Sequence, residues 1–184
     1  MSEPRLIDAV GTSEDADVIQ FLALLPAFST PLEPRLMIVP QTQYQPRQHT
    51  GSLHTPIQFG FPLRDALHQD TTRLIHHDAD AFSSTMQLPQ KMSIVLQFCG
   101  HDQRYSRQVN ILRAHSTPPT RGRLATIVAR EVHRFLTRAA QAGKPFQFGG
   151  QYIAGLEDLI LVDVLHVSKS TLQPTIAIRA QSLA

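Results

Sequence analysis

The stretch of sequence that decides the fold is residues 120–143, TRGRLATIVAREVHRFLTRAAQAG. Its apolar residues recur at the i, i+3, i+4, i+7 spacing of one buried helix face. They are Leu124, Ile127, Val128, Val132, Phe135, Leu136 and Ala139. Thr120 suits the N-cap because its hydroxyl can accept from a free backbone N–H, and Gly143 with Pro145 should end the helix. A helix with one apolar stripe must bury that stripe, so we expect a sheet beneath it.

The segments on both sides of this helix have the pattern of strands. Residues 92–98 (MSIVLQF) and 105–112 (YSRQVNIL) predict a hairpin. Residues 159–167 (LILVDVLHV) are apolar on both faces, as a central strand would be. Residues 174–178 should return as an edge strand, because Pro174 cannot donate to a ladder. The predicted fold class is therefore α+β: a strand-strand-helix-strand-strand core whose antiparallel sheet is covered by one long amphipathic helix.

The first third of the chain predicts an irregular N-terminal arm over residues 1–56, followed by an α+β domain over 57–184, in one folding unit overall. Within the arm, residues 12–25 favour a short helix and 36–39 (LMIV) a short strand. Residues 40–56 are polar, contain proline and lack a period. We favour a mobile loop there, and the alternative is a segment that a partner orders.

Two further elements are expected before the hairpin. Residues 57–62 (IQFGFP) alternate like a strand. Residues 63–77 predict a helix whose apolar positions are Leu67, Leu74 and Ile75.

Composition limits the function classes. The 184 residues carry a formal net charge of +2, with 42% hydrophobic and 17% charged residues, so the chain is globular. The single cysteine, Cys99, excludes an internal disulfide and a zinc site built on cysteines, and we expect it to be a small buried thiol. The first residues lack the apolar segment of a secretion signal, and no run of about eighteen apolar residues exists. We expect an intracellular protein of the cytoplasm or nucleus, with no membrane partner.

An arginine stripe is the first candidate site. Four arginines share one narrow sector of the helix, beside its apolar face, and Glu131 is the only acid on that helix, so the stripe has no obvious partner of its own. Together with two arginines of the hairpin they form the candidate anion-binding or partner-binding set: Arg123, Arg130, Arg134, Arg138, Arg104 and Arg107. Guanidinium groups in a row suit phosphates or an acidic protein surface. The alternative is a solvated face, or arginines paired with acids from elsewhere in the fold.

A histidine–aspartate cluster is the second candidate. The segment HQDTTRLIHHDAD offers imidazole and carboxylate groups of the kind that zinc or non-haem iron takes. The candidate metal ligands are His68, Asp70, His76, His77 and Asp78. A further ligand would have to come from His115, His133 or His166. The alternative is a polar loop whose histidines contact water, because short His and Asp clusters also match by chance.

Two other pairs of reactive residues are weaker candidates for a catalytic site. Asp163 and His166 lie in an apolar strand, but residues three apart point to opposite faces, which argues against an acid–base dyad. Cys99 beside His101 has no third group to complete a nucleophilic site. The chain contains no nucleotide-binding signature, and we predict no cofactor.

A series of short motifs resembles a known group of proteins. The motifs are 118–121 (PPTR), 124–125 (LA), 128–129 (VA), 134–135 (RF), 149–150 (GG), 156–159 (LEDL), 166–168 (HVS) and 173–174 (QP). In this order they are similar to uncharacterised intracellular proteins of mushroom-forming (basidiomycete) fungi, over roughly residues 92–178. The resemblance implies a fungal, intracellular helix–sheet protein and carries no activity with it.

Three function hypotheses follow. The first is a non-enzymatic interaction or self-associating module, whose dimer would form through the exposed edge strand at 174–178. The second is nucleic-acid binding through the arginine stripe. The third is a small-molecule enzyme with a metal at 68–80.

Overall fold

A computed structural model describes residues 36–45, 56–101, 104–149 and 152–179. Residues from Arg35 onward form one compact unit. The helix predicted within 12–25 lies outside the described residues, as do residues 46–55 of the polar loop and 102–103 of the hairpin turn.

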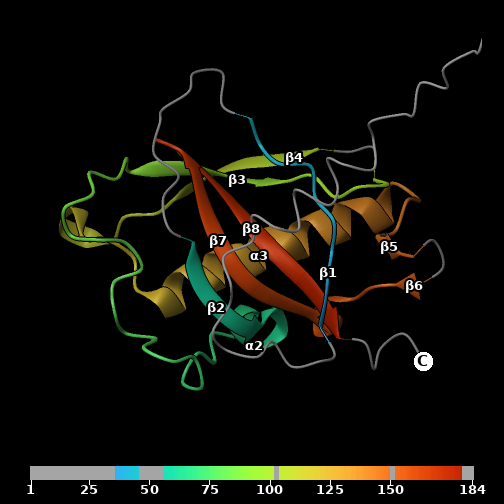
Figure 1. Cartoon of the computed structure of the whole chain (residues 1–184), viewed down its shortest axis with the longest axis horizontal. Coiled ribbons are helices and arrows are strands. Elements are labelled where there is room, and N and C mark those ends of the chain that lie inside the picture. The colour runs from blue at the N-terminus through green and yellow to red at the C-terminus, as the bar shows by residue number, and fades with distance from the viewer. Residues whose placement is uncertain (1–35, 46–55, 102–103, 150–151, 180–184) are drawn as a thin grey trace, which may run out of the picture. The chain divides into compact units, whose positions relative to one another are not determined.

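The main sheet has the strand order β2-β7-β8-β3-β4, and β1 also pairs with β8 (Figure 1). The strands are β1 Leu36–Ile38, β2 Ile57–Pro62, β3 Lys91–Leu96, β4 Tyr105–Asn110, β7 Leu159–Ser168 and β8 Thr171–Arg179. Every pairing in it is antiparallel except that of β3 with β8. Two strands of two residues each, β5 Gln147–Phe148 and β6 Tyr152–Ile153, pair separately. The helices are α2 Leu63–Leu67, η1 Ala114–Ser116, α3 Arg121–Gln141 and η2 Leu156–Asp158.

Helix α3 forms where the sequence predicts it. Thr120 is the N-cap, and its hydroxyl accepts from the backbone N–H of Arg123 at 3.2 Å. The helix ends at Gln141, and Gly143 takes the left-handed conformation with φ at 70°. The predicted cap, glycine stop and length are confirmed.

Helix α3 lies across one face of the sheet (Figure 1). Its buried residues Leu124, Val128, Val132 and Phe135 share one core with inward residues of the strands. These strand residues are Met92, Ile94, Leu96, Leu159, Leu161, Val164, Leu172, Ile176 and Ile178. The α+β fold with a mostly antiparallel sheet under one long helix is thus confirmed.

The prediction that residues 174–178 form an edge strand is wrong. Strand β8 lies inside the sheet, with β7 along one side and β3 and β1 along the other. Pro174 is tolerated because its carbonyl oxygen accepts from the side-chain Nε2 of Gln41 at 2.7 Å, not from a strand. The backbone N and C=O of one strand residue point the same way. The N–H that Pro174 lacks would therefore point in the same direction as its carbonyl, into the space between β1 and β3 along β8. A dimer through 174–178 therefore loses its basis.

The helix predicted over 63–77 is five residues long. Helix α2 ends at Leu67, and Gln69 and His76 then adopt φ values of 63° and 55°, which no α-helix accommodates. Leu74 is buried as predicted, but Ile75 is 74% exposed and is not part of the core formed by the described residues.

The first residues of the segment predicted to be a mobile loop are held by hydrogen bonds in the structure. Gln41 forms a bridge with Phe98, the Thr42 N–H donates to Gln97 O at 2.8 Å, and the Tyr44 N–H donates to Gln173 Oε1 at 2.8 Å. Residues 41–44 are therefore fixed to the sheet.

Candidate anion-binding groove

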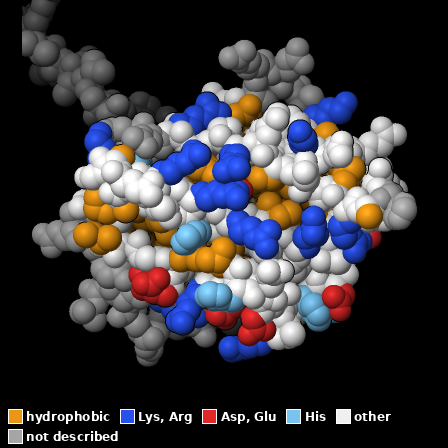
Figure 2. Space-filling view, turned by 180° about the vertical axis from the view of Figure 1, so that it is seen from behind, with side chains coloured by type: hydrophobic (Ala, Val, Ile, Leu, Met, Phe, Trp, Pro, Cys, Tyr) orange, Lys and Arg blue, Asp and Glu red, His pale blue; other side chains and the backbone are white. Residues whose placement is uncertain are grey.

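Part of the arginine stripe lines a groove of about 540 Å³ between α3, β4 and the segment after α2. Arg107 enters it from β4, and Arg123, Arg130 and Arg134 enter it from α3. The space-filling view from behind Figure 1 shows Lys and Arg side chains gathered in a band across this face (Figure 2). The rest of the lining is mostly polar: Gln69, Thr71, Gln108, Val109, Asn110, Gly122, Thr126, Ile127 and Glu131.

Glu131 forms the floor of the groove. The residue is only 1% exposed, and its Oε2 accepts from the Tyr105 hydroxyl at 2.5 Å. Its Oε1 accepts from Nη1 of Arg134, and the Nε of Arg107 lies 3.9 Å from Oε2. Burial, followed by the hydrogen bond to the Glu131 carboxylate, raises the pKa of Tyr105 to about 12. Our inference that the stripe has no acidic partner of its own is wrong for Arg134, because a carboxylate one turn earlier on α3 reaches it.

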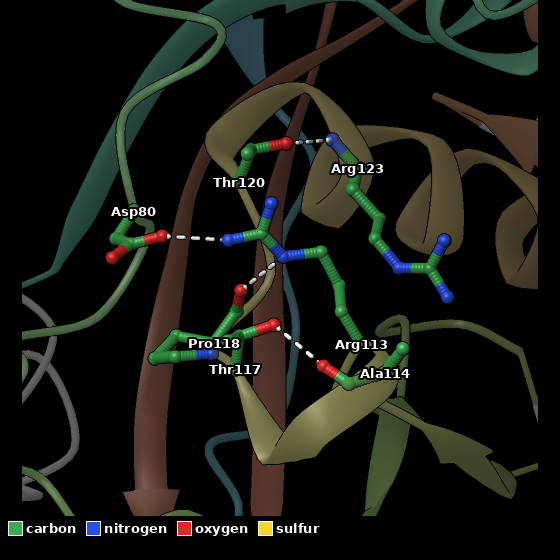
Figure 3. Close-up of polar contacts among 7 residues, drawn as sticks. All are labelled: Asp80, Arg113, Ala114, Thr117, Pro118, Thr120 and Arg123. Atoms are coloured by element: carbon green, nitrogen blue, oxygen red, sulfur yellow. Dashed lines mark hydrogen bonds and ion pairs between the residues drawn. The ribbon is translucent and has the colours of Figure 1, made fainter.

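Arg123 and Arg130, the other two arginines that α3 contributes to the groove, lack the carboxylate partner that Arg134 has. Arg123 and Arg130 are exposed, and their side chains make no hydrogen bond or ion pair within the described ranges. Figure 3 shows the Arg123 guanidinium extending away from its neighbours, while its backbone N–H binds the Thr120 hydroxyl. Four arginines against one carboxylate leave the groove with a net charge of +3 (4 − 1).

The remaining predicted arginines lie outside the groove lining. Arg138 sits over the ring of Tyr105, with its guanidinium carbon 5.5 Å from the ring centre. Arg104 sits over the ring of Tyr44 at 5.2 Å. Both make cation–π contacts, so their charges remain but their positions are set by aromatic rings.

The amino terminus of α3 offers no donor to an anion. The backbone N–H groups of Arg121 and Gly122 donate to the carbonyl oxygens of Ala79 and His77, each at 2.9 Å. The Arg113 guanidinium ties the same region together, because it donates to Asp80 Oδ1 at 3.0 Å and to the Pro118 carbonyl at 2.6 Å (Figure 3). Anion binding on this face therefore depends on side chains.

The structure does not gather the proposed metal ligands. No group of three or more His, Cys, Asp or Glu side chains that could hold a metal occurs among the described residues. His77 Nε2 pairs with Asp78 Oδ2 at 3.0 Å, Asp70 accepts from the Thr72 hydroxyl at 2.9 Å, and His76 is exposed. His68 lies apart from these, in a second groove that His133 also lines. The geometry gives the metal hypothesis no support.

Asp163, His166 and Cys99 have separate surroundings. Burial raises the pKa of Asp163, while hydrogen bonds from Thr175 act in the opposite direction. The His166 ring packs edge-on against Phe82, with ring centres 6.0 Å apart. Cys99 is exposed, so the prediction of a buried thiol is wrong; it follows the end of β3, where the chain leaves the core.

Two features of the site were missed from sequence. The first is the Glu131–Tyr105–Arg107 network, for which a signal exists: residues 105 and 107 are two apart on one strand and so share the face toward α3. The second is the groove of about 740 Å³ between α2, α3 and η2, lined partly by Leu67, Leu136 and Phe146. No sequence pattern brings these distant segments together.

Comparisons with family models, with curated proteins and with solved structures return no match. No helix in the described part of the chain is both long and apolar enough to span a membrane.

Proposed function

We propose that this protein is a non-enzymatic binding module that takes an anionic partner on the groove formed by Arg107, Arg123, Arg130 and Arg134. We also propose that it acts inside the cell, in the cytoplasm or nucleus, where an exposed thiol such as Cys99 stays reduced. The fungal origin implied by the sequence motifs remains part of the same proposal.

One observation carries the proposal: Arg123 and Arg130 line a groove and their charges are unused within the described residues. A solvated face of a helix normally mixes both signs, and its arginines find carboxylates at i+3 or i+4. Here the one carboxylate among the described residues of the groove already binds Arg134 and Tyr105. Two guanidinium groups are thus left to meet phosphate or carboxylate oxygens, to which arginine can donate two hydrogen bonds at once.

The test is a binding measurement with three labelled polyanions at low salt: a duplex oligonucleotide, a single-stranded one and a polyglutamate peptide. We expect the full chain to bind at least one of them. The double variant Arg123→Ala/Arg130→Ala should then lose about tenfold or more in affinity, because a hydrogen bond to a charged group contributes about 1.5–3 kcal/mol and about 1.4 kcal/mol corresponds to a factor of ten.

The matched control is Arg64→Ala/Arg179→Ala, which removes the same charge from exposed positions outside the groove. It should retain most of the affinity. Equal losses of affinity in both double variants would mean that only the overall charge matters. Binding to none of the three polyanions would overturn the proposal.

A further inference from the structure

The chemistry of the groove, beyond its charge, narrows the partner class. Resting on the function proposed above, we propose that the partner is the phosphate backbone of a double-stranded nucleic acid, bound without regard to base sequence. The argument compares three anionic partners: an acidic protein, a single strand and a duplex.

An acidic protein surface is disfavoured because the groove has no apolar anchor. Protein interfaces concentrate their binding energy in aromatic or aliphatic side chains at the centre of the patch. The apolar members of this lining, Val109 and Ile127, are partly buried against the core. The large hydrophobic residues that stand exposed in the described ranges are Met37, Ile38, Ile75 and Ile153, and none of them lines the groove.

A single strand is disfavoured because the groove has no stacking platform. Binding of unpaired bases depends on exposed aromatic rings along the path of the strand. No aromatic side chain occurs among the described residues that line this groove. The nearest ring by contact is that of Tyr105, which is 5% exposed, bonded to Glu131 and covered by Arg138.

A duplex backbone fits the remaining features. Arg123 and Arg134 are eleven residues apart on α3, which is roughly 16 Å at 1.5 Å per residue. That length faces about five phosphates of one strand, since each strand carries one charge per about 3.4 Å of axis. The amides of Gln69, Gln108 and Asn110 add donors beside the arginines, as contacts to phosphate and sugar oxygens require.

The elements that hold the groove arginines also favour contact with the phosphate backbone over contact with base edges. Arg107 reaches the groove from β4, whereas Arg123, Arg130 and Arg134 reach it from α3. Phosphate oxygens can therefore contact arginines of both elements. Helix α3 itself packs against α2 along one flank and against β3 and β4 along another, so it is not free to enter a major groove.

The experiment measures binding of the full chain to duplex DNA of two unrelated sequences, duplex RNA, single-stranded DNA and polyglutamate. We expect the two DNA duplexes to bind within about twofold of each other, and the single strand and polyglutamate about tenfold more weakly. With three to four phosphate contacts, log K should fall with log salt at a slope of about −2.7 to −3.6. Tight binding of either duplex supports the proposal, and the DNA and RNA arms show which one is preferred.

The variants separate a specific groove from general attraction. Arg123→Ala/Arg130→Ala should reduce the magnitude of the salt slope by about 1.8, or 0.9 per lost contact, and Arg64→Ala/Arg179→Ala should leave it unchanged. Preferred binding of the single strand or of polyglutamate would overturn the duplex assignment and leave the anionic-partner function standing. Absence of binding to every probe would overturn both.

Discussion

Glu131 is a buried acid on an otherwise cationic helix face, and its surroundings explain why it is tolerated. A carboxylate that is 1% exposed costs several kcal/mol unless donors satisfy it. Tyr105 and Arg134 donate to its two oxygens, and Arg107 lies near. The acid therefore orients two of the four groove arginines, and it leaves Arg123 and Arg130 unpaired.

Tyr105→Phe should show the cost of removing one of these donors. We expect a loss of about 1–3 kcal/mol in the free energy of unfolding at neutral pH, because Glu131 keeps a buried oxygen without its hydroxyl partner. The measurement is urea denaturation, and Tyr44→Phe is the control. Equal stability of Tyr105→Phe and the wild type would contradict the network.

The same hydroxyl predicts an alkaline titration. The pKa of Tyr105 is raised from its ordinary value of 10.0 to about 12. Because the folded state holds this proton more tightly, its contribution to stability is complete below pH 10 and is lost as the pH rises toward 12. Tyrosinate absorbance should show a late-titrating group that Tyr105→Phe lacks. A titration of that variant identical to that of the wild type would sink the assignment.

At the residue scale, sequence reasoning located the arginines but not their partners. Spacing on a helix places Arg123, Arg130 and Arg134 in one sector, because helical geometry is local. The contact of Glu131 with Tyr105 joins α3 to β4, 26 residues away. Such a contact depends on how the helix docks, which no local pattern encodes.

At the scale of elements, α3 was the most predictable and α2 the least. The caps and apolar period of α3 agree with each other, so propensity and packing favour the same structure. Between residues 63 and 77, a few scattered leucines imitate a helical period. The positive φ values of Gln69 and His76 instead turn this segment toward the first turn of α3.

Gly122 marks the place where that segment meets α3. A Cβ at this position would lie 2.7 Å from the Thr71 hydroxyl oxygen and 3.3 Å from the backbone oxygen of His77. Gly122→Ala gains up to about 1 kcal/mol of helix propensity but forces the segment away, which costs about 1–3 kcal/mol. We expect net destabilisation in thermal unfolding. Gly143→Asn, at a left-handed position open to solvent, is a milder control; a stabilised Gly122→Ala would show that the segment moves freely.

At the scale of the molecule, one core joins α3, α2 and the sheet. We therefore expect the unit from Arg35 onward to unfold in a single transition. Leu124→Ala, at a fully buried position of α3, should lower the free energy of unfolding by about 2–5 kcal/mol. Far-ultraviolet circular dichroism should report the same midpoint as the near-ultraviolet signal of the aromatic residues, which include Tyr105 in β4.

The control for that experiment is Ile75→Ala, because Ile75 is 74% exposed and its truncation should change stability by less than about 0.5 kcal/mol. If Leu124→Ala separated the two optical signals, the helix and the sheet would not share one cooperative unit.

The fold class was predictable, but the order of the strands was not. Hydrophobic patterns identify strands one at a time, and the doubly apolar run of β7 correctly indicated a central position. Pro174 pointed to an edge, because the usual rule for proline considers only backbone partners. The structure satisfies it through the side chain of Gln41, which sequence patterns do not register as part of a sheet.

Gln41 has a wider consequence for how the chain enters its sheet. Its Nε2 donates to Pro174 O at 2.7 Å, and its Oε1 accepts from the Gln97 N–H at 3.4 Å, so one side-chain amide substitutes for a peptide group between two stretches of backbone. Gln173 repeats the arrangement with Thr42 and Tyr44. The path of residues 41–44 is thus held by two side-chain amides that take the place of peptide groups, and a polar segment without a hydrophobic period acquires a defined course.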